Sequence, residues 1–245
     1  MKKPDHFNLT FKAFGEYGLL IEWPAIISEA VLNDIIRLQA TLEKQDDLGI
    51  NETVNAYNSL TLLFDPGKIS VSDLIRKIRT LYTIEGEVES PVRRLWHVPV
   101  CYEPKFSVDL PEISQSKGMK VDEIISLHST QTYTVYFIGF LPGFLYLGGL
   151  REELHTPRRA TPRTRIAKGS VGIGGAQTGI YPSESPGGWN IIGNCPLELF
   201  DSSQEPPCFA KAGDALRFHP IGDSEYSTIK EKVRNGQYIV KSENL

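Results

Sequence analysis

The spacing of apolar residues changes between two periods along the first part of the chain. Leu60, Leu62 and Phe64 alternate along one face, as in a half-buried β-strand, whereas apolar residues in 28–45 recur at the spacing of an amphipathic helix. Ser28 is suited to cap that helix. In chain order, the predicted elements are strands at 7–15 and 18–23, a helix at 28–45, a strand at 57–65 and a helix at 71–82. This pattern predicts a ββαβα layer with its helices on one face of a sheet.

A polar, acidic segment with Gly86 and Pro91 follows this layer. Such composition is typical of a connection between domains. We therefore predict an N-terminal α/β domain at residues 1–88 and a second domain at residues 89–245.

The second part of the chain begins with longer elements and then changes character. We predict a strand at 95–102, helices at 111–118 and 120–129, and a strand at 132–140. Beyond residue 139, Gly and Pro separate short strand-like pieces, which is the rhythm of a β-barrel or a β-sandwich. These pieces lie at 165–175, 190–193, 196–201 and 215–222.

Composition narrows the class of protein. A chain of 245 residues with 40% apolar and 23% charged residues is ordinary for a soluble globular protein. No apolar run approaches the roughly 20 residues that span a bilayer, and the N-terminus has no apolar signal core, which predicts a cytoplasmic protein. The net charge of −4 argues against nucleic-acid binding. The three cysteines have no pairing or metal-ligand spacing, so we predict no metal site.

Nucleotide-binding and catalytic motifs are missing from the sequence. There is no GxxxxGK[ST] motif, and the glycine-rich run at 171–179 is followed by Pro182 rather than by a helical pattern. Nothing resembles HExxH or GxSxG. A self-sufficient enzyme is hard to build from the remaining residues.

A basic stretch from Arg158 to Lys168 is the strongest local signal, because no Asp or Glu occurs from Leu154 to Ser183. Arginine presents a planar fork of donors that suits a carboxylate or a phosphate. The candidate substrate- or anion-binding residues are Arg158, Arg163, Arg165, Gln177, Thr178 and Tyr181. The alternative is that these cations pair with acids elsewhere, such as Glu152, Glu153 and Glu184, or with a partner protein.

Histidines and aromatic residues complete the candidate site. His128, at a helix–strand junction, and His155, beside the basic stretch, are candidate general acids or bases, although a single histidine is more often structural. The neighbouring segments combine glycines with aromatic residues, which suits a pocket wall or a partner surface. The wall residues are Phe140, Pro142, Gly143, Phe144, Tyr146, Ser185, Gly187, Gly188 and Trp189. The alternative for both segments is a tight turn packed in the core.

Three segments together carry a resemblance to a known family. YTVYFIGFLPGFLYLGGL, the stretch from TPRRATPRTRIAKG to GGWNIIG, and AGDALRFHPI resemble the PxpB/KipI family, known as the B subunit of 5-oxoprolinase, kinase A inhibitor or allophanate hydrolase subunit 1. The resemblance covers nearly the whole chain. It implies an α+β fold in which a small N-terminal α/β domain precedes a cyclophilin-like β-barrel.

The same resemblance implies a function. Members of the family act with the A and C subunits of 5-oxoprolinase in the ATP-dependent conversion of 5-oxo-L-proline to L-glutamate, so we expect ATP, with Mg, to be a cofactor of the assembled enzyme and the chain to be inactive alone. Two alternatives stay open. The chain could inhibit the autophosphorylation of a sporulation-type histidine kinase, or it could be a carboxyltransferase-type domain of urea or allophanate metabolism.

Overall fold

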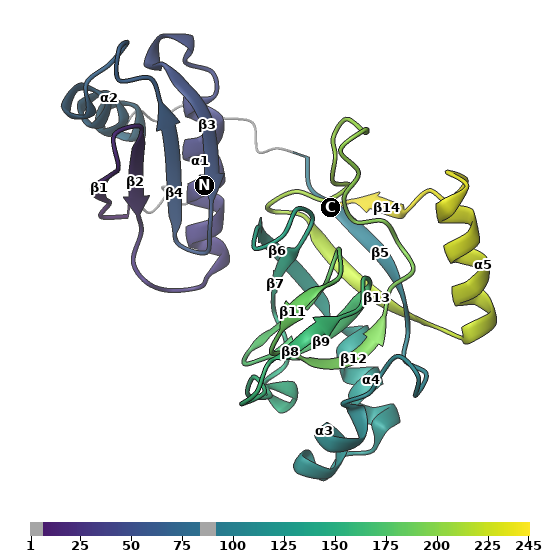
Figure 1. Cartoon of the computed structure of the whole chain (residues 1–245). Coiled ribbons are helices and arrows are strands. Elements are labelled where there is room, and N and C mark those ends of the chain that lie inside the picture. Colours follow the sequence, from purple (N-terminus) through teal and green to yellow (C-terminus); the bar gives the residue numbers. More distant parts are fainter. Residues whose placement is uncertain (1–6, 84–91) are drawn as a thin grey trace. The chain divides into compact units, whose positions relative to one another are not determined.

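The structure is a computed structural model that describes residues 7–83 and 92–245 (Figure 1). The chain divides into two compact units, Met1–Pro91 and Val92–Leu245, and each is described by itself. The predicted boundary between residues 88 and 89 lies outside the described residues, so the exact domain limits remain a prediction. No helix in either described range is long and apolar enough to cross a membrane.

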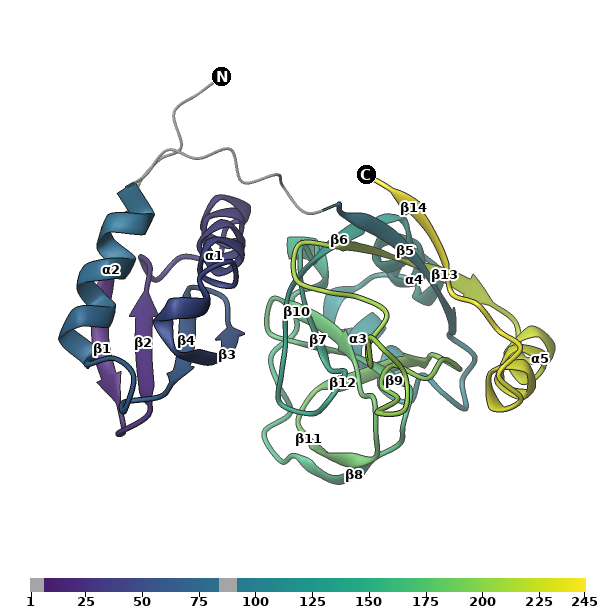
Figure 2. The ribbon, with the colours of Figure 1, turned by 90° about the horizontal axis from the view of Figure 1, so that it is seen from above.

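The first unit is a four-stranded antiparallel sheet with both helices on one face (Figure 2). Leu19, Leu60 and Leu62 point from the sheet into the same core as the apolar side chains of the helices. Ser28 caps the first helix as predicted, because its Oγ accepts a hydrogen bond from the N–H of Val31. The elements are β1 (Thr10–Phe14), β2 (Gly18–Glu22), α1 (Glu29–Leu42), η1 (Asp46–Leu48), β3 (Ile50–Asn55), β4 (Ser59–Phe64) and α2 (Val71–Thr83), with sheet order β1-β2-β4-β3.

The order of elements in the first unit is ββαββα rather than the predicted ββαβα, because strand β3 was not predicted. Its sequence, INETVN, has only Ile50 and Val54 as apolar residues, so it has too little alternation to be recognised. The strand pairs with β4 alone and lies at the edge of the sheet. None of its side chains is fully buried, so the strand leaves little alternation of apolar and polar residues in the sequence.

The second unit is a closed β-barrel, as predicted, and it fits the cyclophilin-like class. Seven strands follow each other in the order β12-β9-β10-β7-β6-β13-β5, and the pair Asn194–Cys101 joins β12 to β5 and closes the barrel. The barrel strands are β5 (Arg94–Cys101), β6 (Thr132–Ile138), β7 (Leu145–Gly148), β9 (Ser170–Gly174), β10 (Gln177–Ile180), β12 (Asn190–Asn194) and β13 (Ala215–Ile221).

Helices and two outer strand pairs surround the barrel. Helices α3 (Leu110–Lys117) and α4 (Val121–Thr130) close one end (Figure 1). A two-stranded ribbon of β8 (Arg163–Ile166) and β11 (Ser185–Gly187) carries Arg163 and Arg165 of the basic stretch, and the turn η2 (Glu152–Leu154) precedes that stretch in the chain. Strand β14 (Lys241–Asn244) pairs with the outer edge of β5.

Three predictions for this unit need correction. The strand-like piece 165–175 is two strands, because the chain turns at Gly169, whose φ of 80° favours glycine. The predicted strand at 196–201 is irregular backbone, in which apolar residues pack on the barrel without pairing. Helix α5 (Asp223–Arg234) was not predicted, since its polar sequence leaves only Tyr226 and Ile229 buried.

Candidate anion and partner site

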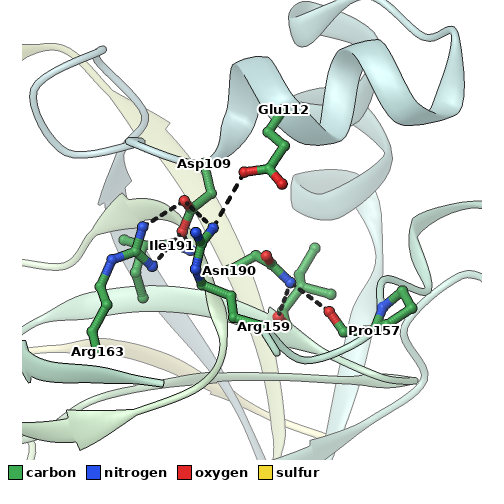
Figure 3. A network of polar contacts seen from close by, with 8 residues as sticks. Asp109, Glu112, Pro157, Arg159, Arg163, Asn190 and Ile191 are labelled. Carbon is green, nitrogen blue, oxygen red and sulfur yellow. Dashed lines mark hydrogen bonds and ion pairs between the residues drawn. The ribbon is translucent and has the colours of Figure 1, made fainter. Parts of the chain in front are cut away.

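Most of the basic stretch is already neutralised by carboxylates of the same chain. Arg163 donates two hydrogen bonds to Asp109, at 2.8 and 2.7 Å (Figure 3). Arg159 donates to the same carboxylate at 3.1 Å and to Glu112 at 3.2 Å. Arg163, which was predicted to bind an anion, thus directs its fork of donors to Asp109 of the same chain.

Asp109 occupies this position because of its place in the chain. It precedes α3 at the N-cap position, and its carboxylate points away from the helix toward the barrel. There it also accepts a hydrogen bond from the backbone N–H of Ile191 at 2.6 Å. The side chain is only 3% exposed, so the two guanidinium groups offset the cost of burying its charge. The hydrogen bonds to the Asp109 carboxylate also raise the pKa of the Arg163 guanidinium.

Two further cations of the stretch have exposed partners. Arg165 lies 2.7 Å from Glu184, and Lys168 lies 2.6 Å from Glu198. The alternative prediction, that the cations pair with acids of the chain, thus holds for Glu184, whereas Glu153 pairs with Arg151 instead. Exposed pairs of this kind are weak, so a partner could displace them at little cost.

Arg158 differs from its neighbours because, within the described part of the chain, no carboxylate pairs with it. The side chain is exposed, and its guanidinium carbon lies 5.8 Å from the ring centre of Trp189. It also lies close enough to Tyr181 to lower the pKa of that phenol, although burial outweighs this effect and raises it overall. Of the predicted anion-binding arginines, Arg158 is the one with no carboxylate partner in residues 7–83 and 92–245.

A pocket of about 460 Å³ opens beside Arg158. Ser116, Thr156 and Thr161 are among its lining residues, together with Pro157, Arg159 and α3 residues. The hydroxyls of Ser116 and Thr156 donate to the backbone carbonyls of Ile113 and Leu154. Asn190 fixes the wall, because its amide donates to the carbonyl oxygens of Pro157, at 2.9 Å, and of Ile173, at 3.2 Å (Figure 3). The pocket thus combines one available guanidinium with a polar, hydrogen-bonding lining.

An aromatic cluster lies behind this site. Phe144, Ile166, Tyr181, Trp189 and Ile191 form one buried group. The rings of Phe144, Tyr181 and Trp189 meet edge to face, an arrangement that aromatic pairs favour. Of the predicted wall residues, Phe144 and Trp189 are therefore buried, and they form a rigid support rather than an open wall.

Glycines make this cluster possible. A Cβ at Gly187 would lie 2.4 Å from the Tyr181 hydroxyl, and a Cβ at Gly174 would lie 2.4 Å from the Trp189 indole. Gly143 has a φ of 82° and would also meet Phe200. Gly174 was not among the predicted site residues, although the run GIGG could have drawn attention to it.

Phe140 is the exposed member of the predicted wall. Its side chain is 61% exposed, and its ring lies 5.5 Å from that of Phe144. It is also the non-glycine residue of the described ranges with a positive φ, 63°. A bulky residue in this conformation costs energy and is often associated with a functional constraint.

The other predicted wall residues are dispersed around this group. Pro142 is exposed beside Phe140, whereas Tyr146, on β7, stacks on Phe137 at 4.1 Å. Ser185 is buried on β11. The carbonyl of Gly188 accepts a hydrogen bond from the N–H of Arg159 at 2.7 Å, which holds the basic stretch against the ribbon.

His128, a predicted general acid or base, lies fully buried inside the barrel. Its ring nitrogens contact the hydroxyls of Tyr102, at 2.8 Å, and Thr178, at 2.9 Å, and the ring stacks on Phe218. Burial lowers the pKa of His128 to about 3, so the ring is neutral. Thr178 is likewise fully buried and donates to the carbonyl of Gly172, so it cannot bind an anion at the surface.

His155 and Gln177 lie closer to the surface. The Nε2 atom of His155 is 3.1 Å from the carbonyl oxygen of Leu150, and its own carbonyl accepts a hydrogen bond from Lys117. Both side chains are half-buried. Cys101, Cys195 and Cys208 are free thiols whose pKa values are raised by burial. In residues 7–83 and 92–245, no group of three or more His, Cys, Asp or Glu is arranged to hold a metal ion.

Comparison with solved structures supports this architecture. The protein TTHA0988 superposes with a TM-score of 0.72 and 31% identity over 84% of this chain, which spans 40% of that protein. The urea amidolyase of K. lactis superposes with a TM-score of 0.81 over 100% of this chain and 17% of that enzyme, but at 20% identity. This second likeness concerns the fold alone.

Comparison with known families and curated proteins is more specific. Residues 9–210 match the family described as carboxyltransferase domain, subdomain C and D. The 5-oxoprolinase B subunit of Bacillus subtilis (strain 168) is 34% identical over 89% of this chain and 95% of its own length. That of Haemophilus influenzae is 45% identical over 71% of this chain and 81% of its own length. The chain therefore belongs to the family of 5-oxoprolinase B subunits.

Proposed function

We propose that this chain is the B subunit of an ATP-dependent 5-oxoprolinase and acts with the A and C subunits to convert 5-oxo-L-proline into L-glutamate. The observation that carries the proposal is the 34 to 45% identity to curated 5-oxoprolinase B subunits over most of the chain. ATP and Mg enter at the level of the assembled enzyme. The assembly acts in the cytoplasm, where thiols such as the three free cysteines remain reduced.

In this proposal, Arg158 binds the carboxylate of the substrate or of its ring-opened product. The carboxyl group of 5-oxoproline is ionised at neutral pH, and a guanidinium fork binds such a group with two parallel hydrogen bonds. The pocket beside Arg158, with Ser116, Thr156 and Thr161 among its lining residues, would surround the rest of the ligand with polar side chains. Because Arg163 and Arg159 are held by Asp109, they fix the loop and leave Arg158 as the ligand-binding arginine.

The chemical step needs groups from the partner subunits. The one carboxylate that lines the pocket, Glu112, already accepts a hydrogen bond from Arg159. Of the two predicted acid–base groups, His128 is enclosed in the barrel, and His155 Nε2 lies 3.1 Å from the carbonyl oxygen of Leu150. We therefore assign substrate orientation to this chain and the phosphoryl transfer and hydrolysis to the assembly.

Phe140 contacts the C subunit in this proposal. An exposed aromatic side chain next to a buried aromatic cluster has the properties of an interface anchor. Its positive φ presents the ring outward at an energetic cost that a partner would offset.

A growth assay tests the proposal. It uses a bacterial strain that lacks its own B subunit and is supplied with 5-oxoproline as sole nitrogen source. We expect the wild-type chain to restore growth together with the A and C subunits, and Arg158→Lys to reduce it, because lysine keeps the charge but loses the fork. Arg165→Lys is the matched control, since Arg165 is 76% exposed and pairs with an exposed glutamate. If the wild-type chain fails to restore growth, the proposal is wrong and inhibition of a histidine kinase becomes the leading alternative.

A further inference from the structure

A cluster of charged and titratable side chains lies on the outer face of the barrel, away from the arginine stretch. It spans β13, β5 and β14, which are neighbouring strands (Figure 1). In the strand register, Arg217 pairs with His97, and His97 pairs with Lys241. His219 lies two residues after Arg217, so all four side chains share one face of the sheet. His219 and Lys241 are exposed, and Arg217 and His97 are half-buried.

Glu243 and the two histidines form a continuous hydrogen-bonded chain. His97 Nε2 lies 3.2 Å from the Glu243 carboxylate, and His97 Nδ1 lies 2.6 Å from His219 Nε2. A carboxylate only accepts hydrogen bonds, so His97 Nε2 carries the proton and His97 Nδ1 is an acceptor. His219 Nε2 must then be the donor to His97. This arrangement leaves His219 Nδ1 with a free lone pair.

Arg217 and Lys241 are cations on the same face of the sheet as His219. Arg217 donates one hydrogen bond to the hydroxyl of Thr132 at 2.8 Å, and within the described ranges neither Arg217 nor Lys241 is paired with a carboxylate. The Nε atom of Arg217 is buried without a partner. Burial is the main cause that lowers the pKa of His219, and the charges of His97, Arg217 and Lys241 lower it further. The ring of His219 is therefore neutral near pH 7. A neutral base thus shares one face of the sheet with two cations that have no carboxylate partner in residues 7–83 and 92–245.

This combination fits one class of ligand. Two cations attract an oxyanion, and the lone pair of His219 accepts a proton from it. At neutral pH a carboxylate or sulfate carries no proton, whereas free phosphate keeps at least one proton and a phosphate monoester, with a second pKa near 6, is partly protonated. A metal ion between the histidines fits poorly, because tetrahedral ligands at about 2.0 Å from zinc lie about 3.3 Å apart, which exceeds the 2.6 Å between these nitrogens.

We propose that Arg217, His219 and Lys241 form a binding site for a protonated phosphate-type oxyanion, either free phosphate or a phosphate monoester. The cations bind the oxygens that carry charge, and the phosphate hydroxyl donates a hydrogen bond to His219 Nδ1. Glu243 and His97 are positioning residues that fix the tautomer of His219. The proposal does not depend on the proposed 5-oxoprolinase activity, because it concerns a separate face of the barrel.

A titration of the full chain with anions at pH 7 tests this site. Binding is monitored through the NMR ring resonances of His219. Three probes are compared: inorganic phosphate, phenyl phosphate and sulfate. We expect phosphate or phenyl phosphate to shift the His219 resonances and to bind at least about tenfold more tightly than sulfate, because sulfate lacks the donated hydrogen bond. Stronger binding of phenyl phosphate identifies a monoester as the ligand, and equal or stronger binding of phosphate identifies the free ion.

Variants separate a specific site from general attraction of anions. Arg217→Gln is expected to weaken phosphate binding at least about tenfold, as loss of a charge-assisted hydrogen bond does. His219→Gln, at an exposed position, is expected to remove the preference over sulfate. Lys211→Gln removes an exposed lysine outside the cluster and should change nothing. Equal binding of sulfate and phosphate, no saturable binding, or an unchanged affinity in Arg217→Gln would overturn the proposal.

Discussion

The carboxylate of Asp109 holds the arginine loop in place. Replacing it by Asn removes the charge that neutralises Arg163 and Arg159 while leaving both guanidinium groups partly buried, at 30% exposure. We expect Asp109→Asn to lower the free energy of unfolding by about 3 kcal/mol, as loss of one member of a buried ion pair does. Urea unfolding measures this change.

Glu112→Gln is the matched control for that prediction. Glu112 contacts the same Arg159, but its side chain is 72% exposed. An exposed pair contributes between about 0 and 1 kcal/mol, so this variant should be nearly as stable as the wild type. Equal effects of the two substitutions would mean that Asp109 does not organise the loop.

His128 makes the stability of the barrel depend on pH. Its pKa is about 3 in the folded chain and about 6.5 when unfolded, so below pH 6.5 the unfolded state binds more protons. Stability is therefore complete above pH 6.5 and is lost as the pH falls toward 3. From pH 7.5 to 5.0 this one group should cost about 2 kcal/mol.

Urea unfolding at pH 7.5 and 5.0 checks that value for the wild type and for His128→Gln, in which this contribution should disappear. If the variant does not fold, the ring nitrogen shifts of His128 in the wild type decide the matter. They should remain those of a neutral ring at pH 5.0, and a protonated ring at that pH would contradict the assignment.

Among the elements, strand β9 depends on a glycine that faces Trp189. A Cβ at position 174 would lie 2.4 Å from the indole ring, so Gly174→Ala must displace Trp189. We expect a loss of about 1 to 3 kcal/mol from overpacking and a shifted indole N–H resonance of Trp189. Gly222→Ala, where nothing lies within 4 Å of the added Cβ, should leave that resonance unchanged. An unshifted resonance in Gly174→Ala would show that the aromatic cluster tolerates a Cβ.

The burial pattern of each element decides whether the sequence predicts it. Amphipathic helices and alternating strands were predictable, because burial of one face leaves a periodic pattern, as in α1 and β4. Strand β3 and helix α5 were not, because each buries too few side chains to leave such a pattern. Tertiary contacts, rather than local sequence, determine elements of this kind.

The sequence showed the arginines of the candidate site but not the carboxylate with which two of them pair. The arginines were evident because they cluster between Leu154 and Ser183. Their partner Asp109 lies 50 and 54 residues earlier, where the sequence indicates only the start of a helix. The burial of His128 was equally hidden, since the barrel core that encloses it is formed by strands distant in the sequence.

For the whole molecule, we expect the loop and the ribbon around Phe140 and Trp189 to form the contact with the C subunit. Hydrogen exchange of residues 140–189 should slow when the chain is bound to that subunit, because a partner that covers the exposed Phe140 excludes solvent from the backbone around it. Phe140→Ser should weaken the complex about tenfold or more, as removal of an interface anchor does. Slower exchange confined to other segments would place the interface elsewhere on the chain.

Reconstitution from purified subunits tests the central claim most directly. The measurement is 5-oxoproline-dependent ATP hydrolysis, with glutamate as the second product, for this chain alone, for the A and C subunits without it, and for all three together. We predict turnover by the complete mixture, little or none when any component is omitted, and at least a tenfold reduction with Arg158→Lys. Turnover by the A and C subunits that is unchanged by adding this chain would contradict the proposed role.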